Sequence, residues 1–497
     1  MRIHRIFLAA AAAALLSTVS SPADEKALNP QIKKIVDEVS EARIQATIEK
    51  LVSFGTRNTL SNADDPQHGI GAARQWIFNE LKSYSPRLQV RFDKWRVKKQ
   101  GQRIFKDVDL YNVVAVLPGK LMPETEILVT GHYDSLNLGQ RQAPPPNADG
   151  TTGSAAAAMT PEEFELNANL PAPGACDDGS GASAVMELAR VMSQYEFDKT
   201  LVFIAFAGEE QGLVGSTLEA AKAKKENEGI EAVLNNDIIG TELSGNGRID
   251  NSTVSVYSDE VMDSPAQQLA RLVREMGERY VPSMKVKVMF MQDRLGRGGD
   301  HTPFQMEGFA AVRISTPNEN YANQHTATDL LESMSVPYTT RVARINSAVA
   351  ASLALAPRPP AVMSIPGRGR GADAGGNRTS TSGGTAGAAP APPAGAPPRG
   401  PTPMISRGQS RYDAQLRWRT TGSDANLRGF AVVIRPTTSP FWEQEIFVGK
   451  VNEYTLKDVS IDDMRFGVKA IGLDGAESLV SPYVYPARKK VVYDTVE

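Results

Sequence analysis

The stretch Glu126-Ile127-Leu128-Val129-Thr130-Gly131-His132-Tyr133-Asp134-Ser135 decides the fold. Its first five residues have the length and character of a buried strand, and a histidine and an aspartate follow directly. Further apolar segments of strand length occur at 113–117, 201–207, 232–236, 286–290 and 310–315. Helical periodicity appears between them, most clearly at 182–194, 265–280 and 341–354. This alternation predicts an α/β fold, with a mostly parallel mixed sheet covered by helices on both faces.

Side chains that bind metals follow three of these segments. Their positions are His132 after 126–130, Glu209 and Glu210 after 201–207, and Asp237 after 232–236. A sheet of this class binds ligands in the crevice beyond the carboxyl ends of its strands, so we expect these side chains to lie close together. Two further segments carry the same kind of group: Asp177-Asp178-Gly179-Ser180-Gly181 and Gln324-His325-Thr326.

Their combination indicates metal-assisted hydrolysis. The chain has only 5 histidines, and three of them lie in or beside these segments: His132, His301 and His325. Cleavage of an amide needs an activated water, a polarised carbonyl and a proton shuttle, and two divalent cations roughly 3.5–4 Å apart can supply the first two. Two imidazoles with three carboxylates suit zinc best, with cobalt and manganese as alternatives. We therefore predict a site for two zinc ions.

Each residue of the set has an expected role. The expected metal ligands are His132, Asp177, Glu210, Asp237 and His325, with Asp177 as the bridge because the glycines after it permit a tight turn into a helix. His132 and Asp237 complete one metal site, and Glu210 and His325 complete the other. Glu209 is expected to be the general base and acid. Asp134 is expected to orient the imidazole of His132.

Composition limits the class of partner and the compartment. A net charge of −3 and a pI near 6.1 give no electrostatic case for nucleic acid. Residues 1–23 combine two arginines, a short apolar run and a small-residue end, which is typical of a signal peptide that is removed on export. We expect a secreted or periplasmic protein without a membrane span. Cys176 is the single cysteine, so no intrachain disulfide is possible, and we expect it to be a small buried neighbour of Asp177.

The chain divides into several parts. Residues 24–356 form the expected catalytic domain, and residues 357–404, rich in Pro, Gly and Ala, the expected flexible linker. Residues 405–497 contain period-two segments at 414–418, 429–434 and 465–470, which predict a small antiparallel β sandwich. This part resembles a fibronectin type III module, with Phe466 where that family usually has tyrosine. Such a module is expected to bind a surface or polymer.

Six motifs in order give the catalytic part a family resemblance. They are Gly131–Ser135, Gly-Ala-Cys-Asp-Asp-Gly-Ser-Gly at 174–181, Ala-Gly-Glu-Glu-Gln-Gly-Leu-Val-Gly-Ser at 207–216, Asn-Asn-Asp-Ile-Ile-Gly at 235–240, Asp-His-Thr-Pro-Phe at 300–304 and His-Thr-Ala-Thr-Asp at 325–329. Over about residues 40–356 the chain resembles the bacterial leucyl aminopeptidase family of two-zinc exopeptidases. The resemblance implies the same metal ligands, the same catalytic Glu209 and a cis peptide bond after Asp177. It also implies that His301 lies near the substrate, in contact with it or in a packing role.

Two departures from the family pattern leave parts of the site open. Residues 136–173 form an Ala- and Pro-rich insertion, either a lid or a surface loop. Gln324 stands where some relatives have tyrosine, so the donor to the tetrahedral oxyanion is not identified, and Tyr321 is a substitute candidate for contact with the substrate.

We therefore expect a metal-dependent aminopeptidase that removes amino-terminal residues from peptides. A carboxypeptidase or dipeptidase of the same fold is an alternative, because Arg294 and Arg297 could hold a terminal carboxylate near His301. Glutaminyl cyclisation, which uses one zinc, and a non-catalytic binding protein are further alternatives.

Overall fold

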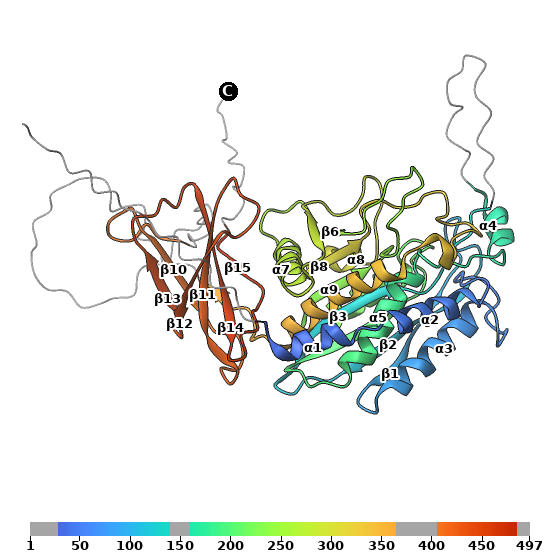
Figure 1. The fold of residues 1–497 in the computed structure, drawn as a ribbon, viewed down its shortest axis with the longest axis horizontal. Helices are drawn as coiled ribbons and strands as arrows, with labels where there is room; N and C mark the ends of the chain where they lie inside the picture. Colours follow the sequence, from blue (N-terminus) through green and yellow to red (C-terminus); the bar gives the residue numbers. More distant parts are fainter. Residues whose placement is uncertain (1–27, 140–158, 364–404, 485–497) are drawn as a thin grey trace, which may run out of the picture.

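The computed structural model describes residues 28–139, 159–363 and 405–484. The expected signal peptide, the centre of the 136–173 insertion and most of the expected linker lie outside the described residues. Figure 1 shows two parts, a large α/β domain and a smaller domain made of strands.

An eight-stranded sheet forms the centre of the α/β domain, with strand order β1-β2-β4-β3-β5-β8-β6-β7. Its strands are β1 (Gln89–Val97), β2 (Val108–Leu117), β3 (Met122–His132), β4 (Lys199–Phe206), β5 (Ile230–Asn236), β6 (Thr253–Tyr257), β7 (Lys285–Met289) and β8 (Ala311–Ser315). The four central strands β4, β3, β5 and β8 run parallel, and antiparallel pairs flank them. The sheet is therefore mixed with a parallel centre, as predicted from the sequence.

Helices cover both faces of this sheet (Figure 1). They are α1 (Pro30–Glu38), α2 (Glu41–Val52), α3 (Gly69–Tyr84), α4 (Pro161–Asn167), α5 (Gly179–Met192), α6 (Val214–Glu226), α7 (Pro265–Tyr280), α8 (His301–Met306), the 3-10 turn η1 (Leu331–Ser333) and α9 (Val336–Leu355). One face packs against α3, α5, α7 and α9 in the main apolar core, and the other packs against α6 and α8 in a smaller one. Among the described residues, no helix combines the length and apolarity needed to cross a bilayer.

Close packing of backbone positions the start of α5 at the sheet. A Cβ atom on Gly181 would lie 2.4 Å from the carbonyl oxygen of Asn236, at the end of β5. Only glycine permits this approach. The residues just before α5 are therefore held beside the carboxyl ends of the central strands.

Two strands of this sheet were not predicted from the sequence. β1 carries charged residues along an exposed edge, so its alternation lacks an apolar face, and β6 has only 5 residues. Both strands lie outside the central parallel strands. The central strands are buried on both faces, so their sequences are the long apolar segments that predicted the sheet.

The C-terminal domain contains two antiparallel sheets that share one core. The first has the order β13-β10-β9 and the second β12-β11-β14-β15. The strands are β9 (Ala361–Val362), β10 (Ala414–Arg419), β11 (Leu427–Pro436), β12 (Gln444–Gly449), β13 (Glu453–Leu456), β14 (Met464–Gly472) and β15 (Ser481–Pro482). Trp418, Phe430 and Phe466 are buried in the core between the sheets. The predicted sandwich architecture is present, while its identity as a fibronectin type III module stays a prediction.

One predicted boundary was wrong. We placed the start of the flexible linker at residue 357, but Ala361 and Val362 form β9 and pair with Arg419 and Trp418 of β10. The backbone hydrogen bonds of this pairing make the first residues of the expected linker part of the C-terminal domain. The strand was not predicted because this segment is rich in proline.

The two domains meet in an interface at α7. Arg435 of β11 forms two hydrogen bonds to the buried carboxylate of Asp263, at 2.8 and 2.9 Å, and Arg271 of α7 pairs with the same carboxylate at 3.1 Å. Trp442 donates to Gln268 of α7 at 3.1 Å. The C-terminal domain is thus joined to the α/β domain by buried polar contacts.

Candidate metal centre

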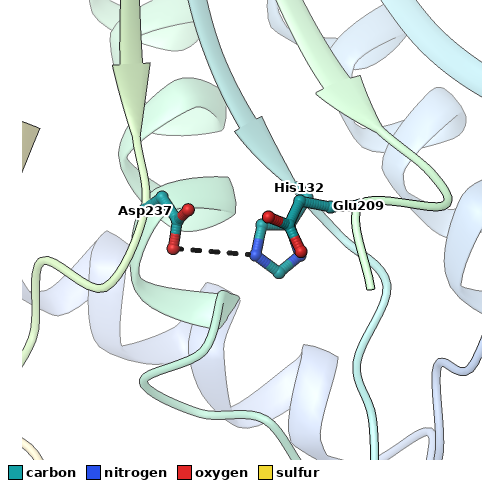
Figure 2. A group of neighbouring side chains, drawn as sticks. All are labelled: His132, Glu209 and Asp237. Carbon is teal, nitrogen blue, oxygen red and sulfur yellow. Dashed lines mark ion pairs between the residues drawn. The ribbon is translucent and has the colours of Figure 1, made fainter. Parts of the chain in front are cut away.

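The five expected ligands converge at the carboxyl ends of the central strands. Two sets of ligand atoms each lie within 4.8 Å of one another: His132, Glu209 and Asp237 in one set, and Asp177, Glu210 and His325 in the other. Figure 2 shows the first set, in which His132 at the end of β3, Glu209 after β4 and Asp237 after β5 face one another. The convergence inferred from strand order is therefore present in the fold.

Asp177, a member of the second set, also reaches His132 of the first set. Its Oδ1 is 3.2 Å from Nε2 of His132, and its Oδ2 is 3.1 Å from Nε2 of His325. The remaining members are slightly farther apart, with 3.8 Å between His132 Nε2 and Asp237 Oδ1 and 3.3 Å between His325 Nε2 and Glu210 Oε2. One carboxylate oxygen toward each histidine is the arrangement that a bridging ligand requires.

Two buried atoms of this group are suited to bind a cation. His132 Nε2 and Glu210 Oε1 have no hydrogen-bond partner among the described residues. An unpartnered buried polar atom is costly, and here both atoms carry lone pairs directed among carboxylates. The donor set of two imidazoles and three carboxylates, with unsatisfied lone pairs, fits divalent metal ions of the zinc class.

The charges of the group explain its protonation when no cation is present. Burial alone lowers the pKa of His132, but the neighbouring carboxylates of Asp134, Asp177 and Asp237 raise it well above its usual range. His325 behaves in the same way, because Glu210 and Asp177 outweigh burial. A metal ion bound among these groups would compete with the protons of the two imidazoles, so metal binding would release protons.

Glu209 projects into a cavity of about 230 Å³ that Asp177, Glu210, Asp237 and His325 also line. Burial raises the pKa of its carboxyl group well above the usual range, and the nearby carboxylates Asp237 and Glu210 add to the increase. A carboxyl group with a raised pKa beside a metal site can both accept and return a proton near neutral pH.

Asp134 differs from its expected role. The ring Nδ1 of His132 lies 3.1 Å from the backbone carbonyl oxygen of Asp134 and 3.6 Å from its carboxylate. The carboxylate instead accepts the backbone N–H groups of Glu209 and Glu210, at 3.3 and 3.2 Å, and the hydroxyl of Thr59 at 3.2 Å. Asp134 therefore orients the histidine through its backbone and fixes the Glu-Glu pair through its side chain.

The peptide bond between Asp177 and Asp178 is cis, as the resemblance implies. Asp178 caps α5 by accepting the N–H of Gly181 at 2.8 Å. It also accepts the backbone N–H groups of His132 at 3.2 Å and Ile238 at 3.1 Å. This one carboxylate ties together three segments that carry ligands, a role that the sequence analysis missed.

Asp329 and Arg313 also support the ligands. Asp329 accepts the backbone N–H groups of Cys176 and Asp177, at 3.0 and 2.9 Å. Arg313, fully buried on β8, lies 3.1 Å from the Asp237 carboxylate and 3.0 Å from that of Asp293. It holds the pKa of Asp237 below its usual value against the effect of burial. Asp329 ends a quoted motif and could have been found, whereas nothing in the sequence marks Arg313.

The backbone lies in the left-handed region at one ligand position and directly after another. His325 has a φ of 58°, and so does Ile238, directly after Asp237. A residue with a Cβ pays roughly 1–2 kcal/mol for this conformation, more when it is β-branched. Such positions concentrate at functional sites, where the surrounding structure holds them.

Three further residues considered in the sequence analysis take different positions around the metal ligands. His301 is fully buried, with Nε2 2.7 Å from the carbonyl oxygen of Gln292, which favours the packing role. Tyr321 is 66% exposed and lines a neighbouring cavity of about 860 Å³ together with His325. Gln324 donates to Asp177 Oδ2 at 2.9 Å, beside the bridging position.

Comparison with known proteins agrees with this geometry. Residues 112–350 match the model of peptidase family M28. The chain is 32% identical over 487 residues to a probable zinc metalloprotease of Leptosphaeria maculans, which covers 92% of this chain and 96% of that protein. The chain belongs to peptidase family M28. A probable zinc metalloprotease of Pyricularia oryzae is 35% identical over 483 residues, which covers 90% of this M28 peptidase and 83% of the relative.

Membership in a family of hydrolases confirms the expected enzyme class. Both relatives are fungal, so assignment to the bacterial leucyl aminopeptidase group within the family stays a prediction.

Solved structures resemble this M28 peptidase at low sequence identity. The Legionella pneumophila LapA aminopeptidase is 20% identical, covers 64% of this chain and 73% of that chain, and has a TM-score of 0.47. The Porphyromonas gingivalis glutaminyl cyclase is 17% identical, covers 62% and 97%, and also has a TM-score of 0.47. These low scores do not choose between the two reactions.

Proposed function

We propose that this M28 peptidase is an aminopeptidase that uses two zinc ions and removes amino-terminal residues from peptides. The observation that carries the proposal is the position of Asp177, with one carboxylate oxygen toward each of the two histidines. His132 and Asp237 would hold one ion, and Glu210 and His325 the other. Metal ions bound there would polarise the substrate carbonyl and make water acidic near neutral pH.

Glu209 is the proton carrier of the proposed reaction. Its backbone N–H is fixed by Asp134 at 3.3 Å, so the carboxyl group is held at the cavity wall. It takes a proton from the attacking water and returns it to the leaving amine. The raised pKa makes its carboxylate a stronger base toward the attacking water.

The test is substitution of the proton carrier without change of the metal ligands. Glu209→Gln is expected to retain its metal while kcat falls by about 10²–10⁴-fold, the range that general acid–base catalysis contributes. Glu226→Gln, on the exposed end of α6, is the matched control and should retain full activity. Full activity of Glu209→Gln would contradict the mechanism.

A second experiment decides which end of the peptide is cleaved. An aminopeptidase hydrolyses an aminoacyl anilide and does not cleave a dipeptide with a blocked amino group. The reverse preference would support the carboxypeptidase alternative. Cyclisation of an amino-terminal glutamine without hydrolysis would support the cyclase.

We also propose export and an accessory role for the C-terminal domain. Export is supported by the composition of residues 1–23, and sequencing the amino terminus of the mature protein tests it. Peptides are the proposed substrates, and a surface or polymer is the proposed partner of the sandwich. Sedimentation of the protein with insoluble polysaccharides or cell envelopes tests that partner, and absence of any such binding would contradict it.

A further inference from the structure

The cavity beside the metal ligands has a cationic wall. Besides the ligand residues, three arginines line its 230 Å³: Arg103, Arg294 and Arg297. They come from two segments far apart in the chain, the β1–β2 connection and the loop between β7 and α8. Bound divalent cations would offset the charge of the ligand carboxylates, so the arginines would set the net charge of the cavity.

The three arginines differ in what they already bind. Arg294 is largely buried, lies 3.0 Å from Asp293 and contacts Glu319. Arg297 pairs with Glu319 at 3.0 Å through Nη1, and its side chain is 32% exposed. In the part of the chain that the structure describes, this is the single side-chain hydrogen bond or ion pair of Arg297, so its Nε and Nη2 donors have no hydrogen-bond acceptor among these residues.

Arg103 is a cation without a carboxylate partner among the described residues. Its Nη1 donates to the backbone carbonyl of Glu210 at 2.6 Å, and its guanidinium lies 5.8 Å from the ring of Phe164. These contacts hold the charge at the edge of the cavity without neutralising it. An unpaired arginine that lines the same cavity as a second arginine with free donors is suited to a planar anion.

We propose that this cavity binds a carboxylate of the peptide substrate, held by Arg297 and Arg103. The inference rests on the proposed function, because it names the substrate class of the same site. The carboxylate has two possible sources, the side chain of an acidic first residue and the free carboxyl end of a dipeptide. Both present the same planar anion to the guanidinium groups.

Two matched substrate pairs test the proposal on the wild-type protein. Glutamyl anilide against glutaminyl anilide varies the charge of the first side chain, and leucyl-glycine against leucyl-glycinamide varies the charge of the carboxyl end. We expect kcat/KM to be at least about 10-fold higher for the charged member of one pair, and that pair identifies the source. A ratio near one in both pairs would overturn the proposal.

Substitution then links the preference to the arginine. Arg297→Gln is expected to reduce the charged-to-neutral ratio of kcat/KM about 10-fold. Arg43→Gln, which removes an exposed arginine paired with Glu80 on the helical face, should leave the ratio unchanged. An undiminished ratio in Arg297→Gln would also overturn the proposal.

Binding provides a readout that does not depend on turnover. In the Glu209→Gln background, calorimetry on the substrate pair that shows the preference should show tighter binding of its charged member than of its neutral member, and Arg297→Gln should remove the difference. Equal affinities for the two members of that pair would contradict the proposal. Chelator-sensitive hydrolysis of neutral leucyl anilide reports the proposed function separately, so the two can fail independently.

Discussion

Glu219 of α6 is a buried carboxylate outside the metal centre, and its environment makes stability depend on pH. Its side chain accepts from Lys222 at 3.1 Å and from Asn112 at 3.3 Å. Burial raises its pKa to about 7, and nearby Asp93 adds to the increase. The folded protein therefore holds this proton more tightly than the unfolded chain does.

The sign of the effect follows from that difference. Because the pKa of Glu219 is raised in the folded state, its protonated carboxyl group stabilises the folded protein fully at pH values below the unfolded-state pKa of about 4.5. This contribution to the free energy of unfolding is lost as the pH rises through the folded-state pKa of about 7. Glu219→Gln keeps the shape without the charge, so relative to wild type it should gain stability between pH 4.5 and 7, by on the order of 3 kcal/mol. Urea unfolding at pH 5 and pH 8 measures the gain, with exposed Glu226→Gln as the control. An equal effect of Glu219→Gln at both pH values would contradict the assignment.

The convergence of three site residues could be predicted because the order of the strands brings them together. His132, Glu209 and Asp237 each follow a buried parallel strand, and such strands end at one edge of the sheet. Asp178 and Arg313 could not be predicted as supports, because their roles depend on backbone groups and carboxylates more than 45 residues away in sequence. Asp134 was placed in the right region, but the structure shows that its carboxylate holds Glu209 and Glu210.

At the scale of elements, Arg57 joins three segments around the metal centre. It is fully buried, and its guanidinium donates to the backbone carbonyls of Leu51, Tyr133, Pro173 and Gly174 at 2.5–3.1 Å. These carbonyls belong to the end of α2, the segment after β3 and the turn before α5. One side chain thus fixes the segments that carry His132 and Asp177.

Arg57→Lys should loosen this junction. An ammonium group has three donors on a single atom and cannot reach four carbonyls spread around a planar fork. We expect a loss of about 2–4 kcal/mol in the free energy of unfolding, because buried carbonyls are left unpaired, and weaker zinc binding. Denaturant unfolding and zinc titration measure the two effects. Unchanged stability and zinc affinity would show that the junction is held by other contacts.

Elements were predicted best where burial leaves a simple pattern. The apolar segments at 201–207 and 232–236 correspond to β4 and β5, and 265–280 coincides with α7. Strands β1 and β6 were missed because an exposed, charged edge and a short length remove that pattern. β9 was missed because its pairing partner lies more than 50 residues further along the chain.

At the scale of the whole molecule, the buried ion group of the domain interface joins the two domains. Phe441, which precedes Trp442 in the C-terminal domain, has its ring centroid 6.1 Å from that of Phe290. Phe290 begins the loop that carries Arg294 and Arg297. The interface therefore touches the segment that forms one wall of the cavity.

Arg435→Gln should uncouple the domains. The change leaves the Asp263 carboxylate with one of its two arginines, and breaking a buried ion pair commonly costs about 3–5 kcal/mol. Scanning calorimetry is expected to show one unfolding transition in the wild type and two in the variant. Arg407→Gln, which removes an exposed ion pair with Asp462, should keep a single transition. A single, unshifted transition in Arg435→Gln would show that the interface does not couple the domains.

We propose that two zinc ions bind between His132 and His325 around the Asp177 carboxylate. The most direct measurement is zinc per chain by plasma emission, taken before chelation, after chelation and after zinc is restored, with aminoacyl anilide turnover at each stage. We predict two zinc ions per chain, loss of both zinc and activity on chelation, and recovery of both when zinc returns. One zinc per fully active chain, or activity that survives complete removal of zinc, would contradict the account.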